Sequence, residues 1–202
     1  MQQLLNDSLW PGAALWVLLY ISDYAFTIAC ARMYQAGVGK ILIFEGSYEL
    51  TPAFQQDVDS LRIFSPRFAI ALLWAVLMLA AIWWLSRLVW PEAYPLALGA
   101  LVLVQLSIHV RHVRNFLLFR RTLAGQGAHG RVEYGRPLIL QLSAVEMLGF
   151  GVIFLVGSAI TGSLFLLGGA ASCLALAAKH FRLARMAASA KRPPSAEGEA
   201  RG

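Results

Sequence analysis

The sequence predicts an all-α protein, a polytopic bundle of about five transmembrane helices with one short amphipathic helix on the cytoplasmic side. Of its 202 residues, 58% are hydrophobic and 14% are charged. Soluble domains carry about 25% charged residues, so this chain lacks the polar surface that water requires. Its apolar residues also gather into stretches of about 20, the length that crosses a bilayer core of about 30 Å. We therefore expect one bundle domain over residues 1–188 and a disordered tail over 189–202, which has no bulky apolar residue.

The first predicted transmembrane helix covers residues 10–34, and the second covers residues 67–90. Pro11 lies near the start of the first helix, where a missing backbone N–H does no harm. The second helix is the most apolar, and tryptophans near its end suit the interface between membrane and water. A turn with a proline at each end, over 91–95, separates it from the next helix.

The third predicted helix covers residues 94–119 and becomes polar in its second half. The apolar block over 137–179 is too long for one crossing at a rise of about 1.5 Å per residue. Small residues over 157–163 divide it into a fourth helix, 137–158, and a fifth, 162–179. The fifth is short and weakly hydrophobic, so a re-entrant segment is the alternative for that stretch.

Basic residues predict the orientation. Cytoplasmic loops of membrane proteins are rich in Lys and Arg, and here the connection after the third helix and the C-terminal tail are basic, whereas the last turn is uncharged. We predict a cytoplasmic (inner) membrane protein with its N-terminus outside and its C-terminus in the cytoplasm. The net charge of +6 would also suit nucleic acid, but basic residues at helix ends contact lipid headgroups, so the bilayer is the expected partner and nucleic acid is not. The basic residues concerned are Arg120, Arg121, Arg131, Arg136, Lys179, Arg182, Arg185, Lys191 and Arg192.

Three ionisable residues from three predicted helices lie at a similar height. Asp23 is about 16 Å from the cytoplasmic end of its helix at the usual rise per residue. His109 and Glu146 lie at similar distances from the ends of their own helices. Charge at membrane depth is costly and is kept where it is paired, lines a cavity or serves a function. We therefore expect all three side chains to point into the bundle, in the inner half of the membrane.

Other polar residues share helix faces with these three. Thr27 lies one turn after Asp23, within reach of its carboxylate. Arg111 is deep enough to need a carboxylate partner, and Asp23 and Glu146 are the candidates. Three interpretations are open: a buried network that fixes helix register, a cavity for a small polar ligand, ion or proton, and a metal or catalytic site. The candidate polar cluster is Asp23, Thr27, Gln105, His109, Arg111, His112, Asn115 and Glu146.

The metal alternative depends on His109 and His112, whose spacing places both on one face of the third helix. Two such histidines and a carboxylate such as Glu146 can hold zinc or iron. The sequence has no H-E-x-x-H, P-loop, G-x-S-x-G or D-x-x-D pattern, so we assign no catalytic residue and expect an enzyme less than a binding protein. A metal-assisted membrane enzyme is the alternative function.

The connection over 35–66 is long for a turn, so it is expected to contain structure of its own. Thr51 and Pro52 supply a helix N-cap and a proline at the first helical position. Apolar residues then recur at helical spacing. We predict an amphipathic helix over 52–64 that lies on the membrane surface, or folds back as a lid over the inner mouth of the bundle.

The same connection carries two glutamates, Glu45 and Glu49. We expect them at the inner mouth, where they can meet Arg111, Arg114 or His112. The alternative is a solvated loop that only caps a helix.

Two short patterns carry a resemblance. Asp23 and Thr27 form Asp-x-x-x-Thr, and residues 49–52 read Glu-Leu-Thr-Pro. Together they resemble a pattern in small uncharacterised prokaryotic multi-pass membrane proteins, which typically have Glu-x-Asn-Pro where this chain has Thr51. The resemblance covers about the first third of the chain. It implies a prokaryotic membrane location and no particular activity.

The leading functional interpretation is a non-enzymatic membrane protein that binds or passes a small polar species, or serves as a subunit of an assembly. Small residues permit close packing of helices, within the chain or between protomers, so a homo-oligomer or a partner in a membrane complex fits the sequence. These small residues are Gly149, Gly151, Gly168 and Ser172.

Overall fold

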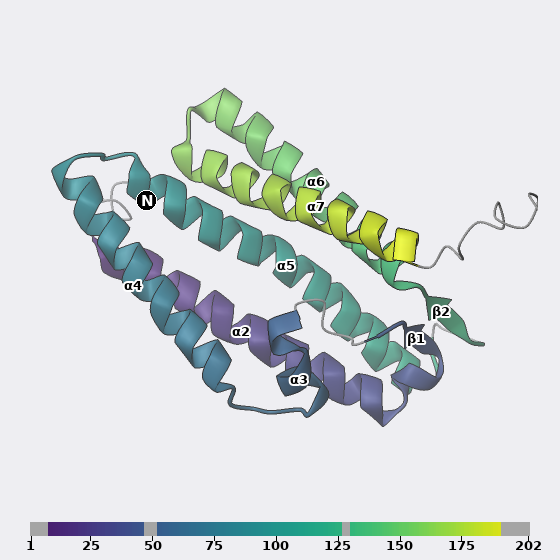
Figure 1. The fold of residues 1–202 in the computed structure, drawn as a ribbon. Coiled ribbons are helices and arrows are strands. Elements are labelled where there is room, and N and C mark those ends of the chain that lie inside the picture. Colours follow the sequence, from purple (N-terminus) through teal and green to yellow (C-terminus); the bar gives the residue numbers. More distant parts are fainter. Residues whose placement is uncertain (1–7, 47–51, 127–129, 191–202) are drawn as a thin grey trace, which may run out of the picture.

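The computed structural model describes residues 8–46, 52–126 and 130–190. Its main elements are long helices that run back and forth side by side (Figure 1). Five of them are long and apolar enough to cross a membrane, which confirms the predicted all-α bundle. These five are α2 (Leu9–Ala36), α4 (Pro66–Leu88), α5 (Ala93–Leu123), α6 (Arg136–Thr161) and α7 (Leu164–Ala190).

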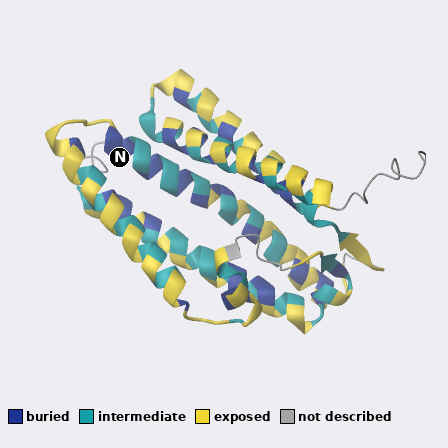
Figure 2. Cartoon of the chain, viewed as in Figure 1, coloured by how far each residue is buried: buried dark blue, intermediate teal, exposed yellow. Residues whose placement is uncertain are grey.

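Helix α5 lies at the centre of the bundle, with α2 and α4 on one side and α7 on the other (Figure 1). Helix α6 packs along α7 and forms an outer edge. Buried residues therefore gather on α5, whereas α4 is exposed over most of its surface (Figure 2). The exposed side chains of α4 and α6 are largely leucine, isoleucine, valine and tryptophan. Apolar surfaces of this extent are suited to contact with lipid.

Glycines allow α5 and α7 to touch backbone to backbone. A Cβ atom at Gly99 would collide with the backbone of Phe165, and one at Gly168 would collide with the carbonyl oxygen of Leu96. Small residues let membrane helices approach in this way. Gly168 therefore packs within the chain, whereas a Cβ atom at Gly149 would have nothing within 4 Å.

Helix α7 is longer than the predicted fifth helix, 162–179. It is one continuous helix of 27 residues that ends at Ala190, so the re-entrant alternative does not hold for the described residues. It also includes the first residues of the predicted tail, 189–202. The remainder of that tail, 191–202, lies outside the described residues.

The extension of α7 has a packing reason. Ala177, His180 and Ala184 are all buried, and their spacing places them on one helix face. This stripe keeps contact with the bundle beyond Lys179, where the hydropathy of the sequence falls.

Two short strands, which the sequence did not predict, lie at one end of the bundle. Strand β1 (Leu42–Phe44) follows a 3₁₀ turn, η1 (Val38–Lys40), and pairs in parallel with β2 (Val132–Tyr134). The strands join the connection after α2 to the connection before α6. Leu42 is buried there in a cluster with Phe119 of α5.

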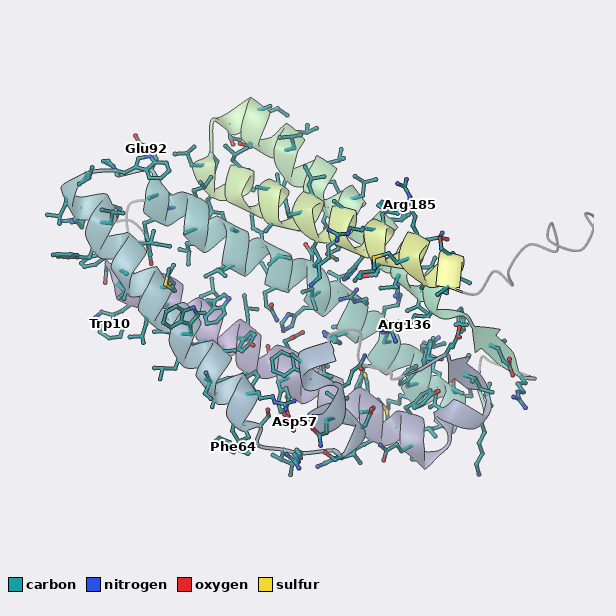
Figure 3. All side chains as sticks on the ribbon, viewed as in Figure 1. Trp10, Asp57, Phe64, Glu92, Arg136 and Arg185 are labelled. Carbon is teal, nitrogen blue, oxygen red and sulfur yellow. The ribbon has the colours of Figure 1, made fainter. Side chains whose placement is uncertain are left out.

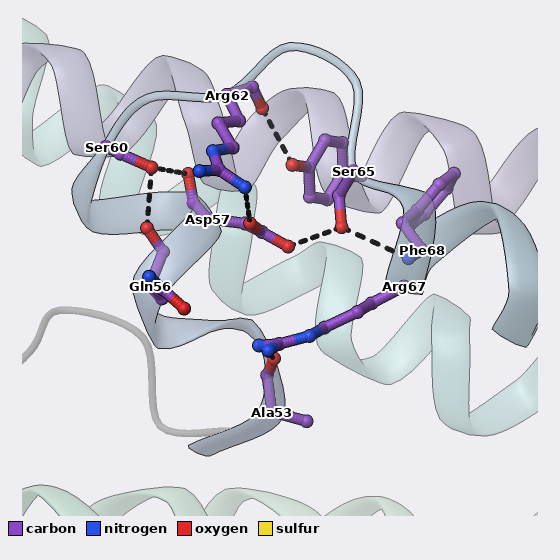
Figure 4. A network of polar contacts seen from close by, with 9 residues as sticks. Ala53, Gln56, Asp57, Ser60, Arg62, Ser65, Arg67 and Phe68 are labelled. Carbon is purple, nitrogen blue, oxygen red and sulfur yellow. Dashed lines mark hydrogen bonds and ion pairs between the residues drawn. The ribbon is translucent and has the colours of Figure 1, made fainter.

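Helix α3 (Pro52–Asp59) is shorter than the predicted amphipathic helix over 52–64. A network around Asp57 ends it and ties it to the start of α4 (Figure 4). Arg62 Nη1 donates to Asp57 Oδ1 at 3.1 Å, and Ser65 Oγ donates to Asp57 Oδ2 at 2.5 Å. The Asp57 side chain is therefore held inside the protein, and the residue is only 3% exposed.

The two ends of the bundle differ in charge. Trp10 and Glu92 lie near one end, and Arg136 and Arg185 lie toward the other (Figure 3). The second end, called the basic end below, also carries both strands and the arginines in the last turn of α5.

The length of α4 indicates how deep the polar residues lie in the membrane. Its 23 residues span about 34 Å, close to the thickness of about 30 Å of a bilayer core. Phe68, in its first turn, lies against Tyr20 and Tyr24 of α2 at ring-centroid distances of 4.7 and 4.6 Å. Asp23 lies between these two tyrosines in the sequence. It is therefore level with the first turn of α4, which is the end of that helix nearer the basic end of the bundle. The predicted polar layer therefore lies near the edge of the apolar zone, because α2 and α5 extend beyond α4.

Candidate ligand-binding cavity

A cavity of about 620 Å³ lies among α2, α5, α6 and α7, and both strands contribute to its lining. Small-molecule sites typically have about 300–1,000 Å³. About half of the lining residues are aliphatic or aromatic. The polar half is Asp23, Thr27, Arg111, His112, Arg114, Asn115, Ser143, Glu146 and His180.

Asp23 and His112 join α2 to α5 at one wall of the cavity. Asp23 Oδ1 lies 2.7 Å from His112 Nε2, which is an ion-pair distance. Even so, Oδ1 has no hydrogen bond of acceptable geometry, and His112 Nδ1 is buried with no partner. This wall therefore has hydrogen-bonding capacity that the described protein does not use.

A second polar chain joins α5 to α6 and α7. Arg111 Nη1 donates to Ser143 Oγ, and Ser143 Oγ lies 2.9 Å from His180 Nδ1. A guanidinium can only donate hydrogen bonds, so the serine hydroxyl accepts from Arg111 and keeps its own hydrogen for the imidazole. Arg111 thus contacts a neutral side chain at the cavity wall.

Arg114 and Glu146 form a bridge from α5 to α6. Arg114 Nη1 donates to Glu146 Oε1 at 2.7 Å, and the side chains are 61% and 19% exposed. Arg114 Nη2 also donates to Asn115 Oδ1 at 3.4 Å. The bridge lies at the rim of the cavity rather than in its interior.

The charges of the lining do not cancel locally. Its carboxylates are Asp23 and Glu146, and each already lies against a basic side chain, His112 or Arg114. The guanidinium of Arg111 is left with the neutral Ser143. A positive charge partly removed from water and without an anion is unfavourable, so the cavity is chemically suited to an incoming negative group.

The structure brings together most of the predicted cluster but excludes two members. Asp23, Thr27, Arg111, His112, Asn115 and Glu146 line the cavity. Gln105 and His109 do not. The backbone carbonyl oxygen of Gln105 accepts from His109 Nδ1 at 2.7 Å. His109 Nε2 lies 2.6 Å from Ser22 Oγ on α2. His109 therefore joins α5 to α2 instead of facing the cavity.

The expected pair between Arg111 and a carboxylate is replaced by the contact with Ser143. The reason is rotation about the helix axis. Neighbouring residues on a helix point about 100° apart, so His112 reaches Asp23 on α2 while Arg111 points toward α6 and α7.

Of the two glutamates expected at the inner mouth, Glu45 and Glu49, only Glu45 lies within the described residues. Glu45 Oε2 accepts from the backbone N of Arg136 at 3.0 Å, at the N-terminus of α6, where a negative charge is favoured by the helix dipole. Glu49 lies outside the described residues. Helix α3 packs on α2 through Val58, and its described residues supply none of the cavity lining, so they form no lid.

The metal alternative gains no support from the geometry. Both ring nitrogens of His109 contact other groups, Gln105 and Ser22, and His112 Nε2 faces Asp23. Within the described ranges, no three His, Cys, Asp or Glu side chains are grouped so that they could hold a metal ion.

The sequence prediction omits Ser143 and His180. Ser143 precedes Glu146 by three residues and shares its helix face, which is a signal that could have identified it. His180 had no such signal, because the predicted fifth helix ended one residue before it.

No protein-family model, curated protein or solved structure matches this chain.

Proposed function

We propose that this integral membrane protein binds a small ligand with an anionic group in the cavity. The observation that carries the proposal is Arg111, which lines the cavity and donates to the neutral Ser143 while both lining carboxylates face other basic groups. An anion placed beside Arg111 would form charge-assisted hydrogen bonds, the strong class of such bonds.

Unused hydrogen-bonding groups support binding over a purely structural network. A network that only fixes helix register is expected to satisfy its buried polar atoms. Here Asp23 Oδ1 and His112 Nδ1 are buried without a hydrogen-bond partner among residues 8–46, 52–126 and 130–190. Asn115 and Thr27 add side-chain donors to the same lining, so a small polar ligand finds several partners at once.

Charge at the two ends supports a location and an orientation. The basic end carries the arginines of α5 and the basic residues of α7, whereas Glu92 lies near the opposite end (Figure 3). Following the positive-inside rule, we place the basic end in the cytoplasm and the N-terminus outside, in the cytoplasmic membrane of a prokaryote.

Calorimetric titration of the detergent-purified protein with dihexanoyl phosphatidic acid, a soluble molecule that carries a phosphate group, tests this function. The substitution Arg111→Gln should weaken binding about 10-fold or more, since a hydrogen bond to a charged group contributes about 1.5–3 kcal/mol. The matched control is Arg120→Gln, an exposed arginine of α5 outside the lining. Equal affinity in the wild type and Arg111→Gln, or equal losses in both variants, would contradict the proposal.

A further inference from the structure

We infer that the anionic group is the headgroup of an acidic lipid, drawn from the leaflet at the basic end, whose acyl chains leave the cavity through its side. This inference rests on the proposed function and specifies the class of ligand. It follows from the depth of the cavity, from the apolar side chains that line it toward the basic end, and from the side chains at its mouth.

The depth of the cavity matches a lipid headgroup. Asp23 is level with the first turn of α4 through the contacts of Phe68 with Tyr20 and Tyr24. Because α4 is about as long as the bilayer core is thick, its first turn marks the boundary where headgroups lie. His112 contacts Asp23, so the polar wall of the cavity lies at this boundary.

The cavity is closed toward the basic end by apolar side chains. Leu42, Phe44 and Tyr134 of the two strands belong to its lining. The rings of Phe44 and Tyr134 stack with centroids 5.6 Å apart, and Phe119 of α5 is buried beside them. A soluble anion arriving from that side would meet an aromatic layer before it reached Arg111.

The side of the cavity is open and largely aliphatic. Helix α6 packs closely on α7 and is joined to α5 by side-chain hydrogen bonds from Arg111 and Arg114, with the cavity between them. Leu118, Leu142 and Val145 line the cavity and are also 41%, 53% and 58% exposed. Residues that both line a cavity and face outward form its mouth, and Arg114, which is 61% exposed, belongs to it as well. At this depth the aliphatic part of the mouth faces lipid chains.

The two halves of the lining match the two halves of a lipid. Arg111, which has no carboxylate partner in the described part of the chain, is suited to a phosphate or carboxylate headgroup. The aliphatic mouth at Leu142 and Val145 is suited to acyl chains. A free phosphate would use the first feature and gain nothing from the second, so the structure favours the amphiphile over the soluble ion.

Native mass spectrometry of the full-length protein distinguishes these ligands. Three probes are compared: dioleoyl phosphatidic acid, dioleoyl phosphatidylcholine and glycerol 3-phosphate. We expect the acidic lipid to bind at least about 10-fold more tightly than either of the others. The substitution Val145→Trp should block the mouth and weaken binding of the acidic lipid, whereas Val152→Trp, at an exposed position further along the same helix, should leave it unchanged.

The outcomes separate this inference from the proposed function. If glycerol 3-phosphate binds as tightly as the acidic lipid and depends on Arg111, the cavity is an anion site but its ligand is soluble, and the lipid inference is overturned. Unchanged lipid binding in a folded Val145→Trp variant overturns it as well. If no probe depends on Arg111, the proposed function fails together with the inference. Thermal unfolding of each variant shows whether it is folded.

Discussion

Asp57 and Asp23 both lie near the boundary of the apolar zone, but their surroundings differ. Asp57 is 3% exposed and has a donor for each carboxylate oxygen, Arg62 for Oδ1 and Ser65 for Oδ2 (Figure 4). Asp23 lies against His112, yet its Oδ1 has no hydrogen-bond partner. One carboxylate is saturated by the protein and the other is not.

The two groups of charged residues also differ in what they connect. The Asp57 network connects neighbouring segments, the end of α3 and the start of α4, and Ser65 also accepts from the backbone N of Phe68 to cap α4. The cavity cluster connects four helices that are far apart in the chain and leaves a guanidinium on a neutral serine. Polar atoms without hydrogen-bond partners, in a cavity lined by several helices, are typical of a site that can receive a ligand.

The largest expected effect is the loss of the saturated network. Asp57→Ala should lower the free energy of unfolding by about 2–3 kcal/mol, because the buried Ser65 hydroxyl loses its acceptor and the half-exposed Arg62 loses its ion pair. Equilibrium denaturation in detergent measures this. Gln56→Ala, on an exposed side chain of the same helix, is the control and should change little. Binding of the anionic ligand should survive, since the described part of α3 does not line the cavity.

A double-mutant cycle tests the pairing of Asp23. Asp23→Asn and His112→Gln should show a coupling of about 1–2 kcal/mol in unfolding free energy, because the two side chains are in contact. The cycle of Asp23→Asn with Arg111→Gln should be additive within about 0.5 kcal/mol. A larger coupling in the second cycle than in the first would restore the pair that the sequence suggested and remove the unpaired cation.

A substitution at Arg111 in the cavity should change the stability in the opposite direction from a substitution at Asp57. Arg111→Met should raise the stability of the ligand-free protein by up to about 1 kcal/mol, because it removes a charge that has no counter-ion among the described residues and keeps an unbranched apolar stem. The melting temperature of lipid-depleted protein measures this. If Arg111→Met destabilises the protein as much as Asp57→Ala does, Arg111 belongs to a structural network.

The smallest expected effect concerns Glu45, which lies outside both networks. Glu45→Gln should lower stability by about 0.5 kcal/mol, because the amide oxygen can still accept from Arg136 N but the charge at the N-terminus of α6 is lost. The difference between the melting temperatures of the two proteins should shrink in high salt, which screens exposed charges. A difference that does not depend on salt would indicate lost packing instead.

The sequence predicted the class of fold because hydropathy reports it directly. Segments such as 67–90 and 137–158 are apolar over the length of a bilayer, and α4 and α6 correspond to them. It did not predict β1 and β2, since strands of three residues leave no periodic signal. The two strands lie far apart in the chain, and pattern alone does not pair such segments.

The sequence pointed to only some of the residues that line the cavity. Asp23, Arg111 and Glu146 stand out because charge is rare in apolar helices, and all three line the cavity. Partners depend on rotation about each helix axis, which the sequence does not specify closely. The cavity also draws on Ser143, whose neutral side chain is unremarkable in sequence, and on His180, beyond the last apolar stretch.

The close approach of Gly99 and Gly168 has a mechanical consequence. Both glycines lie near the start of their helices, α5 and α7, at the end of the bundle opposite the strands. The two backbones are in direct contact there, with no room for a side chain between them. At the other extremity α6 reaches α5 through the side chains of Arg111 and Arg114. The backbone contact at the two glycines thus fixes the position of α7 on α5 at that end. Adjustment of the cavity to ligands of different size is therefore expected at the side chains that join α5 to α6, because side chains change rotamer more readily than packed backbones separate.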